Sequence, residues 1–81
     1  MAYQVTLRKR AIKALEKINE PYYKQAIYNL AENPCPIGFK KLKGRDGYRI
    51  RVADYRIIYD IFDDVLTVDV IDLGHRKSIY N

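Results

Sequence analysis

The sequence predicts an α+β domain in which an N-terminal helical hairpin packs on one face of an antiparallel sheet, in the order β-α-α-β-β-β. Two stretches of helical periodicity fall in the first half of the chain, and three strand-like runs separated by short polar breaks fill the second half. Because 81 residues leave room for one hydrophobic core, we expect a single domain over residues 1–81.

The first half should form one strand and two helices. Tyr3 to Leu7 alternates and contains β-forming residues, which favours a first strand. From about Lys9, apolar residues recur at helical spacing, at Ala11, Ile12, Leu15 and Ile18. Pro21 suits the first turn of a second helix, whose apolar stripe comprises Tyr23, Ile27, Leu30 and Ala31. The proline-rich segment 33–38 then ends helical structure, and a basic loop, Lys40–Arg45, leads into the strands.

The second half should form a β-meander of two tight hairpins, with strands at Tyr48 to Val52, Tyr55 to Phe62 and Val65 to Leu73, and Gly74 ending the last strand. A two-residue turn at Ala53-Asp54 pairs Val52 with Tyr55, Arg51 with Arg56, Ile50 with Ile57, Arg49 with Ile58 and Tyr48 with Tyr59. The same treatment of Asp63-Asp64 pairs Ile61 with Leu66, Tyr59 with Val68 and Ile57 with Val70. Both turns place apolar residues on the same face, which we therefore expect to be the core.

The opposite face is predicted to carry Arg49, Arg51 and Arg56, with Ile58 and Ile71 beside them. Arg51 and Arg56 would lie directly opposite each other, although like charges in such a pair cost up to about 1 kcal/mol. Because the planar guanidinium matches phosphate oxygens bidentately, an all-arginine face favours RNA binding over a merely solvated strand face, which remains the alternative. We expect the C-terminal tail or a partner protein to cover the two isoleucines in part.

The formal net charge of +5 is unevenly distributed, with +7 in residues 1–45 and −2 in residues 46–81. The basic half indicates a polyanion or an acidic protein as partner, although a solvated lysine-rich helix would carry the same charge. Cys35 is the single cysteine, so an intrachain disulfide and a cysteine-based zinc site are excluded. Apolar runs are too short to span a bilayer and no signal segment begins the chain, so we expect a cytoplasmic protein that does not enter a membrane.

The C-terminal segment adds His75, Arg76 and Tyr80. A lone histidine is more often an ordinary surface residue, but this one follows the strand that lies beside Arg56. We expect the segment to bring a candidate proton-transfer imidazole, a further phosphate-binding group and a ring for base stacking to the arginines.

Four motifs, in this order and at this spacing, resemble the RelE branch of the RelE/ParE toxin superfamily over essentially the whole chain. They are Lys41-Leu42-Lys43-Gly44, Gly47-Tyr48-Arg49-Ile50-Arg51-Val52, Asp54-Tyr55-Arg56-Ile57-Ile58-Tyr59, and Gly74-His75-Arg76-Lys77 with Tyr80. The resemblance implies a type II toxin that cuts messenger RNA, typically in the ribosomal A site, and is held inactive by an acidic RelB-like antitoxin. In this family the RNA 2′-hydroxyl attacks the neighbouring phosphate, so the resemblance implies neither a metal nor a cofactor.

The resemblance also implies roles for individual residues. Arg56 and Arg76 match the arginines that stabilise the phosphate, and Tyr80 matches a tyrosine that stacks on the substrate base. Arg49 and Arg51 match positions often occupied by lysine. The basic loop would contribute RNA-binding residues, namely Lys41, Lys43 and Arg45.

The arginines at the two lysine positions alter the expected mechanism. Arginine stays protonated at any ordinary pH, so Arg49 and Arg51 are assigned to charge stabilisation and positioning. Proton transfer would then fall to His75, with Tyr80 as the other candidate. Two other functions stay open: a ParE-like inhibitor of DNA gyrase, which shares the fold, and a non-catalytic RNA- or ribosome-binding module.

Overall fold

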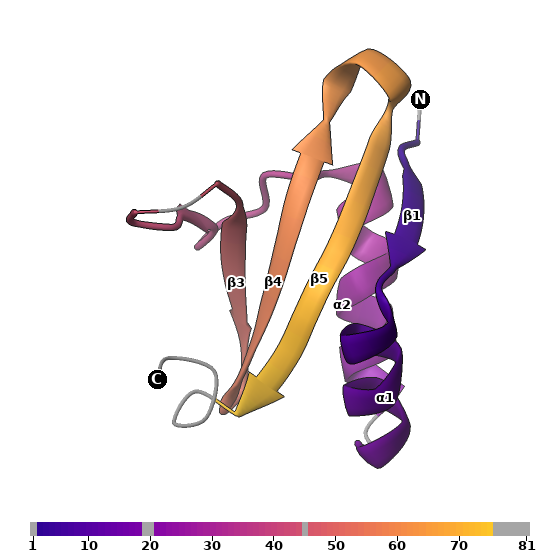
Figure 1. The fold of residues 1–81 in the computed structure, drawn as a ribbon, viewed down its shortest axis with the longest axis vertical. Coiled ribbons are helices and arrows are strands. Elements are labelled where there is room, and N and C mark those ends of the chain that lie inside the picture. The colour runs from indigo at the N-terminus through magenta and orange to yellow at the C-terminus, as the bar shows by residue number, and fades with distance from the viewer. Residues whose placement is uncertain (1, 19–20, 45, 76–81) are drawn as a thin grey trace.

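The computed structural model describes residues 2–18, 21–44 and 46–75. Its elements are β1 (Gln4–Leu7), α1 (Lys9–Lys17), α2 (Pro21–Glu32), β2 (Lys40–Lys41), β3 (Tyr48–Val52), β4 (Tyr55–Phe62), the 3-10 turn η1 (Asp63–Val65) and β5 (Thr67–His75). The sheet order is β1-β5-β4-β3-β2, so the first strand lies beside the last (Figure 1). Within these ranges, no helix is both long and apolar enough to cross a membrane.

The predicted α+β class is confirmed, with two differences in the sheet. β1 pairs in parallel with β5, so the sheet is mixed rather than wholly antiparallel. Most of the chain separates these two strands, so no hairpin turn constrains their relative direction. The segment predicted as a basic loop begins with the short strand β2, which pairs Lys40 with Arg49 and Lys41 with Tyr48. A two-residue strand is too short to be recognised by alternation.

The hydrophobic core lies between the helices and one face of the sheet. Its buried members are Ala11, Ile27 and Leu30 from the helices and Ile50, Ile57, Tyr59, Val68, Val70 and Leu73 from the strands. The buried Tyr59 hydroxyl donates a hydrogen bond of 2.7 Å to the carbonyl oxygen of Pro34. Burial raises the pKa of Tyr59 well above its ordinary value. This tyrosine therefore ties the centre of the sheet to the segment that follows α2.

The predicted register of the first hairpin is confirmed at every position, from Val52 opposite Tyr55 to Tyr48 opposite Tyr59. The turn between the strands is short, and Ala53 adopts a positive φ of 54° there. A tight turn leaves the strands no freedom to slip, so the arginine positions follow directly from the turn.

The predicted register of the second hairpin is wrong by two residues. Ile61 lies opposite Val68 rather than Leu66, and Tyr59 lies opposite Val70. The turn is longer than two residues because η1 occupies Asp63–Val65 and Leu66 adopts a left-handed conformation with φ 47°. A slip of two residues preserves the faces, so Val68 and Val70 still point into the core.

Two further corrections concern the end of β5. An irregularity between Ile58 and Tyr59 leaves Ile71 as an extra residue on β5, so Ile57 lies opposite Leu73 rather than Val70. Gly74 does not end the strand. It pairs with Arg56 inside β5, which continues to His75.

Candidate nucleic-acid interface

A basic patch lies on the sheet face that points away from the helices. It consists of Lys40 on β2, Arg49 and Arg51 on β3, and Arg56 on β4, and we call it the basic sheet patch. Lys40 lies opposite Arg49, and Arg51 lies opposite Arg56. Since residues i and i+2 of a strand share a face, neighbouring Cβ atoms of the patch are about 5 to 8 Å apart. The structure thus brings together the three arginines expected from the sequence and adds a lysine.

No acidic residue lies directly across the strands from the patch. Beyond Arg49 and Arg56, the next residues on this face are Ile58 and Gly74. Within the described ranges, Lys40, Arg49 and Arg51 form no ion pair with an acidic side chain. The positive charge of these three side chains favours binding of a polyanion.

The acidic residues of β5 pair with a different set of arginines. Arg8 Nε lies 2.9 Å from Asp69 Oδ2, and Arg10 Nη2 lies 3.3 Å from Asp72 Oδ2. Both of these arginines come from the start of the helical hairpin, on the far side of β5 from β3. Both carboxylates therefore form ion pairs with arginines outside the basic sheet patch, and Asp72 does so from the position opposite Ile58 on the same face.

A pocket of about 290 Å³ opens within the patch, at the β2 edge of the sheet. Lys40, Arg49 and Arg51 line it together with Ile37 and Gly38. The side chain of Ile37 is fully exposed, and Gly38 adopts a positive φ of 92° in the turn that precedes β2. The pocket therefore combines three cationic groups with one solvated aliphatic side chain.

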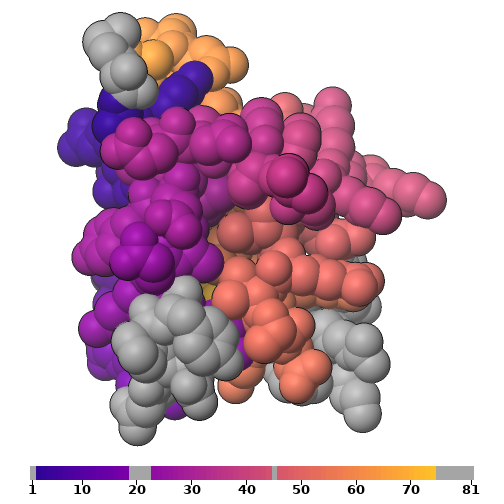
Figure 2. Space-filling model, turned by 180° about the vertical axis from the view of Figure 1, so that it is seen from behind, coloured from indigo at the N-terminus to yellow at the C-terminus, as the bar shows by residue number. Residues whose placement is uncertain are grey.

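The basic loop between β2 and β3 projects from the edge of the molecule, as both overall views show (Figures 1 and 2). The Leu42 N–H donates a hydrogen bond of 3.0 Å to the Gly47 carbonyl oxygen, which closes the loop. Lys41 and Lys43 are exposed there. Arg45 lies outside the described residues. The loop can approach a ligand, but neither Lys41, the last residue of β2, nor Lys43 lines the pocket.

The C-terminal residues assigned to catalysis are only partly described. The backbone of His75 pairs with Tyr55, and its neighbour Gly74 pairs with Arg56. His75 is thus the residue of β5 directly after the one that pairs with Arg56. Its side chain, and the whole of Arg76 and Tyr80, lie outside the described residues, so their convergence with the arginines stays a prediction.

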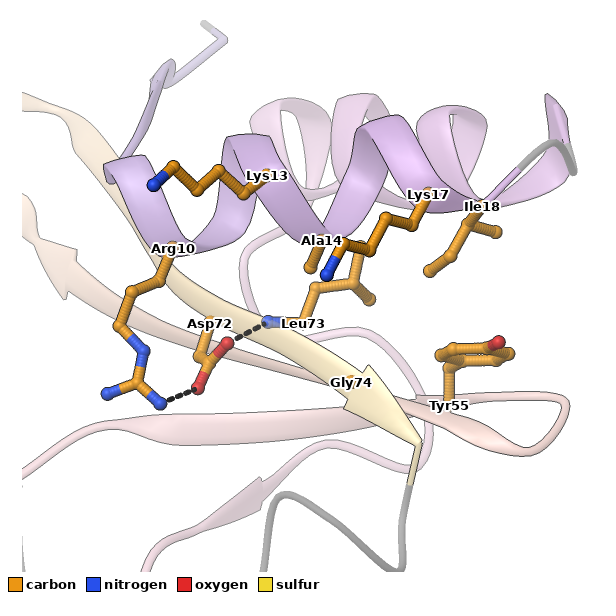
Figure 3. A pocket seen from close by; sticks show the side chains of 9 residues that line it. All are labelled: Arg10, Lys13, Ala14, Lys17, Ile18, Tyr55, Asp72, Leu73 and Gly74. Carbon is orange, nitrogen blue, oxygen red and sulfur yellow. Dashed lines mark hydrogen bonds and ion pairs between the residues drawn. The ribbon is translucent and has the colours of Figure 1, made fainter.

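A second basic surface lies on the helix side, between α1 and the end of β5. A groove of about 430 Å³ is bordered by the cationic side chains of Arg10, Lys13 and Lys17. Its apolar floor includes Ala14, Ile18 and Leu73. Figure 3 shows Arg10 reaching across to Asp72, whose other carboxylate oxygen accepts a hydrogen bond of 2.8 Å from the Leu73 N–H. From the sequence, only a basic first helix was predicted in this region, without the groove.

The two isoleucines on the outer face behave differently from each other. Ile58 is only 5% exposed in the single chain, although it lies outside the core cluster. Ile71 is half-buried at the irregularity of β5. Ile58 is therefore already covered and does not require a partner protein.

Sequence reasoning missed Lys40 and Ile37 as members of the site. Lys40 was placed in a loop, and only its pairing with Arg49 brings it to the arginine face. No group of three or more His, Cys, Asp or Glu side chains in the part of the chain that the structure describes is arranged to hold a metal ion. The chemistry that these residues offer is binding of phosphate by guanidinium and ammonium groups.

Comparison with known proteins agrees with this fold. A family model described as the ParE toxin of the type II toxin-antitoxin system parDE matches residues 5–80. A putative RelE-like toxin protein of Escherichia coli is 33% identical over 89 residues, which cover 100% of this chain and 93% of the relative. The mRNA interferase toxin RelE of Escherichia coli K12 is 31% identical over 83 residues, covering 95% of this chain and 86% of the relative.

Solved structures give the same result. The archaeal RelE-RelB complex from Pyrococcus horikoshii OT3 contains a chain with a TM-score of 0.78 and 29% identity, covering 96% of this chain and 99% of that chain. The isolated Escherichia coli RelE toxin has a TM-score of 0.77 and 29% identity, with coverage of 98% and 92%. The chain therefore belongs to the RelE/ParE family of type II toxin-antitoxin toxins and is RelE-like.

Proposed function

We propose that this toxin is an endoribonuclease that cleaves messenger RNA on the ribosome in the cytoplasm and so inhibits translation. The observation that carries the proposal is the direct opposition of Arg51 and Arg56 beside Arg49, in a cluster to which β2 adds Lys40. The close approach of these like charges opposes folding by up to about 1 kcal/mol, whereas a phosphate bound between them would gain charge-assisted hydrogen bonds. The relatives named mRNA interferase support the assignment.

The proposed reaction needs only the RNA and side chains of this protein. A ribose 2′-hydroxyl loses its proton to a base and attacks the adjacent phosphorus. The 5′-oxygen of the next nucleotide leaves with a proton from an acid, which yields a 2′,3′-cyclic phosphate and a 5′-hydroxyl. Arg49, Arg51 and Arg56 would stabilise the negative charge that grows on the phosphate oxygens. Loss of one such group typically lowers the rate about 100- to 1,000-fold.

Proton transfer requires residues other than the arginines, because a guanidinium does not lose its proton in a protein. We assign this step to His75, with Tyr80 as the other candidate, and Arg76 joins the phosphate-binding arginines. Replacement His75→Ala should lower the single-turnover cleavage rate more than the affinity for RNA. An unchanged single-turnover rate would remove His75 from the mechanism.

We also propose an acidic antitoxin as the partner that inhibits the toxin. Several solved relatives are complexes of RelE with RelB. The groove bordered by Lys13 and Lys17, with its apolar floor, has the chemistry to accept an acidic amphipathic segment. The candidate partner is the product of a small acidic reading frame next to the gene. If the charge reversal Lys13→Glu with Lys17→Glu weakens co-purification of the antitoxin, the result would support this groove as the binding site. Unchanged co-purification would exclude the groove.

Primer extension on translated messenger RNA tests the enzymatic proposal. New RNA ends that depend on ribosomes and disappear with Arg51→Ala, but persist with the exposed control Lys9→Ala, are the expected result. The family model that matches the chain is described as a ParE toxin, which favours inhibition of DNA gyrase as the second candidate. Inhibition of supercoiling without new RNA ends would select that function. Ribosome or RNA binding without either effect would select a non-catalytic binding module.

A further inference from the structure

The pocket at the β2 edge contains a lysine for which the proposed cleavage reaction has no role. Lys40 lines it together with Arg49 and Arg51, and Ile37 stands fully exposed at its rim. Arg51 pairs with Arg56, whereas Lys40 pairs with Arg49 and lies one strand farther out. The patch is therefore wider than one phosphate requires.

The spacing of the patch fits a chain of phosphates rather than a single anion. Its cations span three adjacent strands, β2, β3 and β4, and neighbouring strands are about 4.8 Å apart. The backbones at Lys40 and Arg56 are thus separated by two strand spacings, about 10 Å, and are also offset by two residues along the strands. Side chains that extend straight out from the sheet over this distance match successive phosphates of an extended RNA strand better than they match a single phosphate.

Ile37 supplies a second kind of contact at the same place. A large aliphatic side chain in full solvent contributes nothing to the core, and its neighbour Gly38 with φ 92° holds it in a tight turn. Proteins that bind single strands stack bases on aromatic side chains beside a cationic groove, and an exposed aliphatic side chain in that place offers a smaller apolar surface for the same packing. The pocket thus offers charge for a phosphate and an apolar surface for the attached nucleoside.

We propose that Lys40 and Ile37 form a subsite for the nucleotide adjacent to the scissile phosphate, with Lys40 and Arg49 on the neighbouring phosphate and Ile37 on its nucleoside. The subsite rests on the proposed ribonuclease function, because it needs RNA at the basic sheet patch. The subsite holds the RNA strand in position and takes no part in proton transfer. Its effect is therefore on binding and positioning.

The test measures affinity for a short single-stranded RNA that carries one 2′-deoxy nucleotide at the cleavage position and so cannot be cut. The variants are Lys40→Gln and Ile37→Ser, with Lys40→Arg as the charge-preserving variant and the exposed Lys9→Gln as the matched control. One phosphate contact to a single strand changes the slope of log affinity against log salt by about 0.7. Raising the salt concentration from about 50 to about 200 mM should therefore weaken RNA binding about 2.6-fold less in Lys40→Gln than in the wild type. Lys40→Arg and Lys9→Gln should leave the slope unchanged.

Neutral methylphosphonate linkages locate the phosphate. One linkage is placed on the 5′ side of the cleavage position in one RNA and on the 3′ side in another. For one of these RNAs, wild-type affinity should fall and Lys40→Gln should have no further effect. Ile37→Ser should weaken binding without changing the salt slope. An equal slope for Lys40→Gln and Lys9→Gln, or no salt-dependent binding by the wild type, would overturn the subsite.

Failure of the subsite and failure of the proposed function give different results. If primer extension shows cleavage and Lys40→Gln leaves the salt slope unchanged, the nuclease assignment stands and the subsite does not. If the uncut RNA binds through Lys40 and the wild type produces no new RNA ends, the subsite stands on a binding module. Thermal unfolding of each variant checks that the exposed substitutions leave the fold intact.

Discussion

The hydrogen bond from the Tyr59 hydroxyl to the Pro34 carbonyl oxygen offers the most direct test of how the sheet is tied to the segment after α2. Tyr59 is fully buried, and the bond is 2.7 Å long. Replacement Tyr59→Phe keeps the ring and removes the donor, which leaves the Pro34 carbonyl without this partner. A lost hydrogen bond that leaves a buried acceptor unpaired costs about 1 to 3 kcal/mol. Because Pro34 is only part-buried, we expect about 1 to 2 kcal/mol.

The pH dependence of this difference follows from the raised pKa of Tyr59, which burial causes. The folded state holds the phenolic proton at a pH where the unfolded chain, with an ordinary tyrosine pKa of about 10, releases it. Stability from this group is therefore complete below about pH 10 and falls as the pH rises through and above that value. Relative to pH 8, titration of Tyr59 alone lowers the unfolding free energy of the wild type by about 1.4 kcal/mol at pH 11, and this contribution is absent in Tyr59→Phe.

Urea unfolding followed by far-ultraviolet circular dichroism at pH 8 and pH 11 measures both effects. The wild type should exceed Tyr59→Phe in unfolding free energy by about 1 to 2 kcal/mol at pH 8. The gap should close by about 1.4 kcal/mol at pH 11, while the titration of every other group is shared by the two proteins and cancels. A gap that stays constant between the two pH values would refute a desolvated Tyr59 phenol.

Two further predictions concern the first hairpin and the loop that leads into it. Gly47 has φ 118°, and a Cβ added there would lie 3.2 Å from the Tyr59 carbonyl oxygen and 3.3 Å from Leu42 Cδ1, so Gly47→Ala should destabilise the fold by about 2 to 4 kcal/mol. A change below about 0.5 kcal/mol in urea unfolding would contradict the strained close approach. Arg51→Glu replaces a like-charge pair by an opposite-charge pair, so it should raise stability by about 0.2 to 1 kcal/mol while lowering cleavage about 100-fold or more. Parallel loss of stability and activity in thermal unfolding and primer extension would show that Arg51 serves the fold instead.

The accuracy of the sequence predictions followed the length of the turns. Ala53-Asp54 is a two-residue connection, and such a turn admits one register, so every pair of the first hairpin was predictable. The second connection also contains two aspartates, yet η1 and the left-handed Leu66 extend it. A non-glycine residue with positive φ leaves no clear signal in the sequence, so the slip of two residues could not be foreseen.

The site residues, too, could be predicted only where a tight turn fixes the strands that carry them. Arg49, Arg51 and Arg56 were placed correctly because they belong to the tightly connected strands. Lys40 was missed because its position depends on a two-residue strand, which has no periodicity to detect. Ile37 gave no signal either, since an isoleucine between proline and glycine is equally compatible with a buried or an exposed turn.

The patch and the core occupy opposite faces of the same two strands, and this arrangement allows an unfavourable cluster of charge to be held rigidly. Ile50 and Ile57, which pair across the strands, are buried at the positions that alternate with Arg49, Arg51 and Arg56. Burying one such side chain contributes about 1.5 to 3 kcal/mol, whereas the facing arginines cost up to about 1 kcal/mol. The core face of the hairpin therefore more than offsets the repulsion on its outer face. Because the two-residue turn fixes which residues oppose each other, the arginines cannot relieve their repulsion by a slip of register, which would turn Ile50 and Ile57 to solvent. A phosphate bound there, as proposed, would relieve the repulsion without any change in the sheet, so its binding energy would not be spent on reorganising the site.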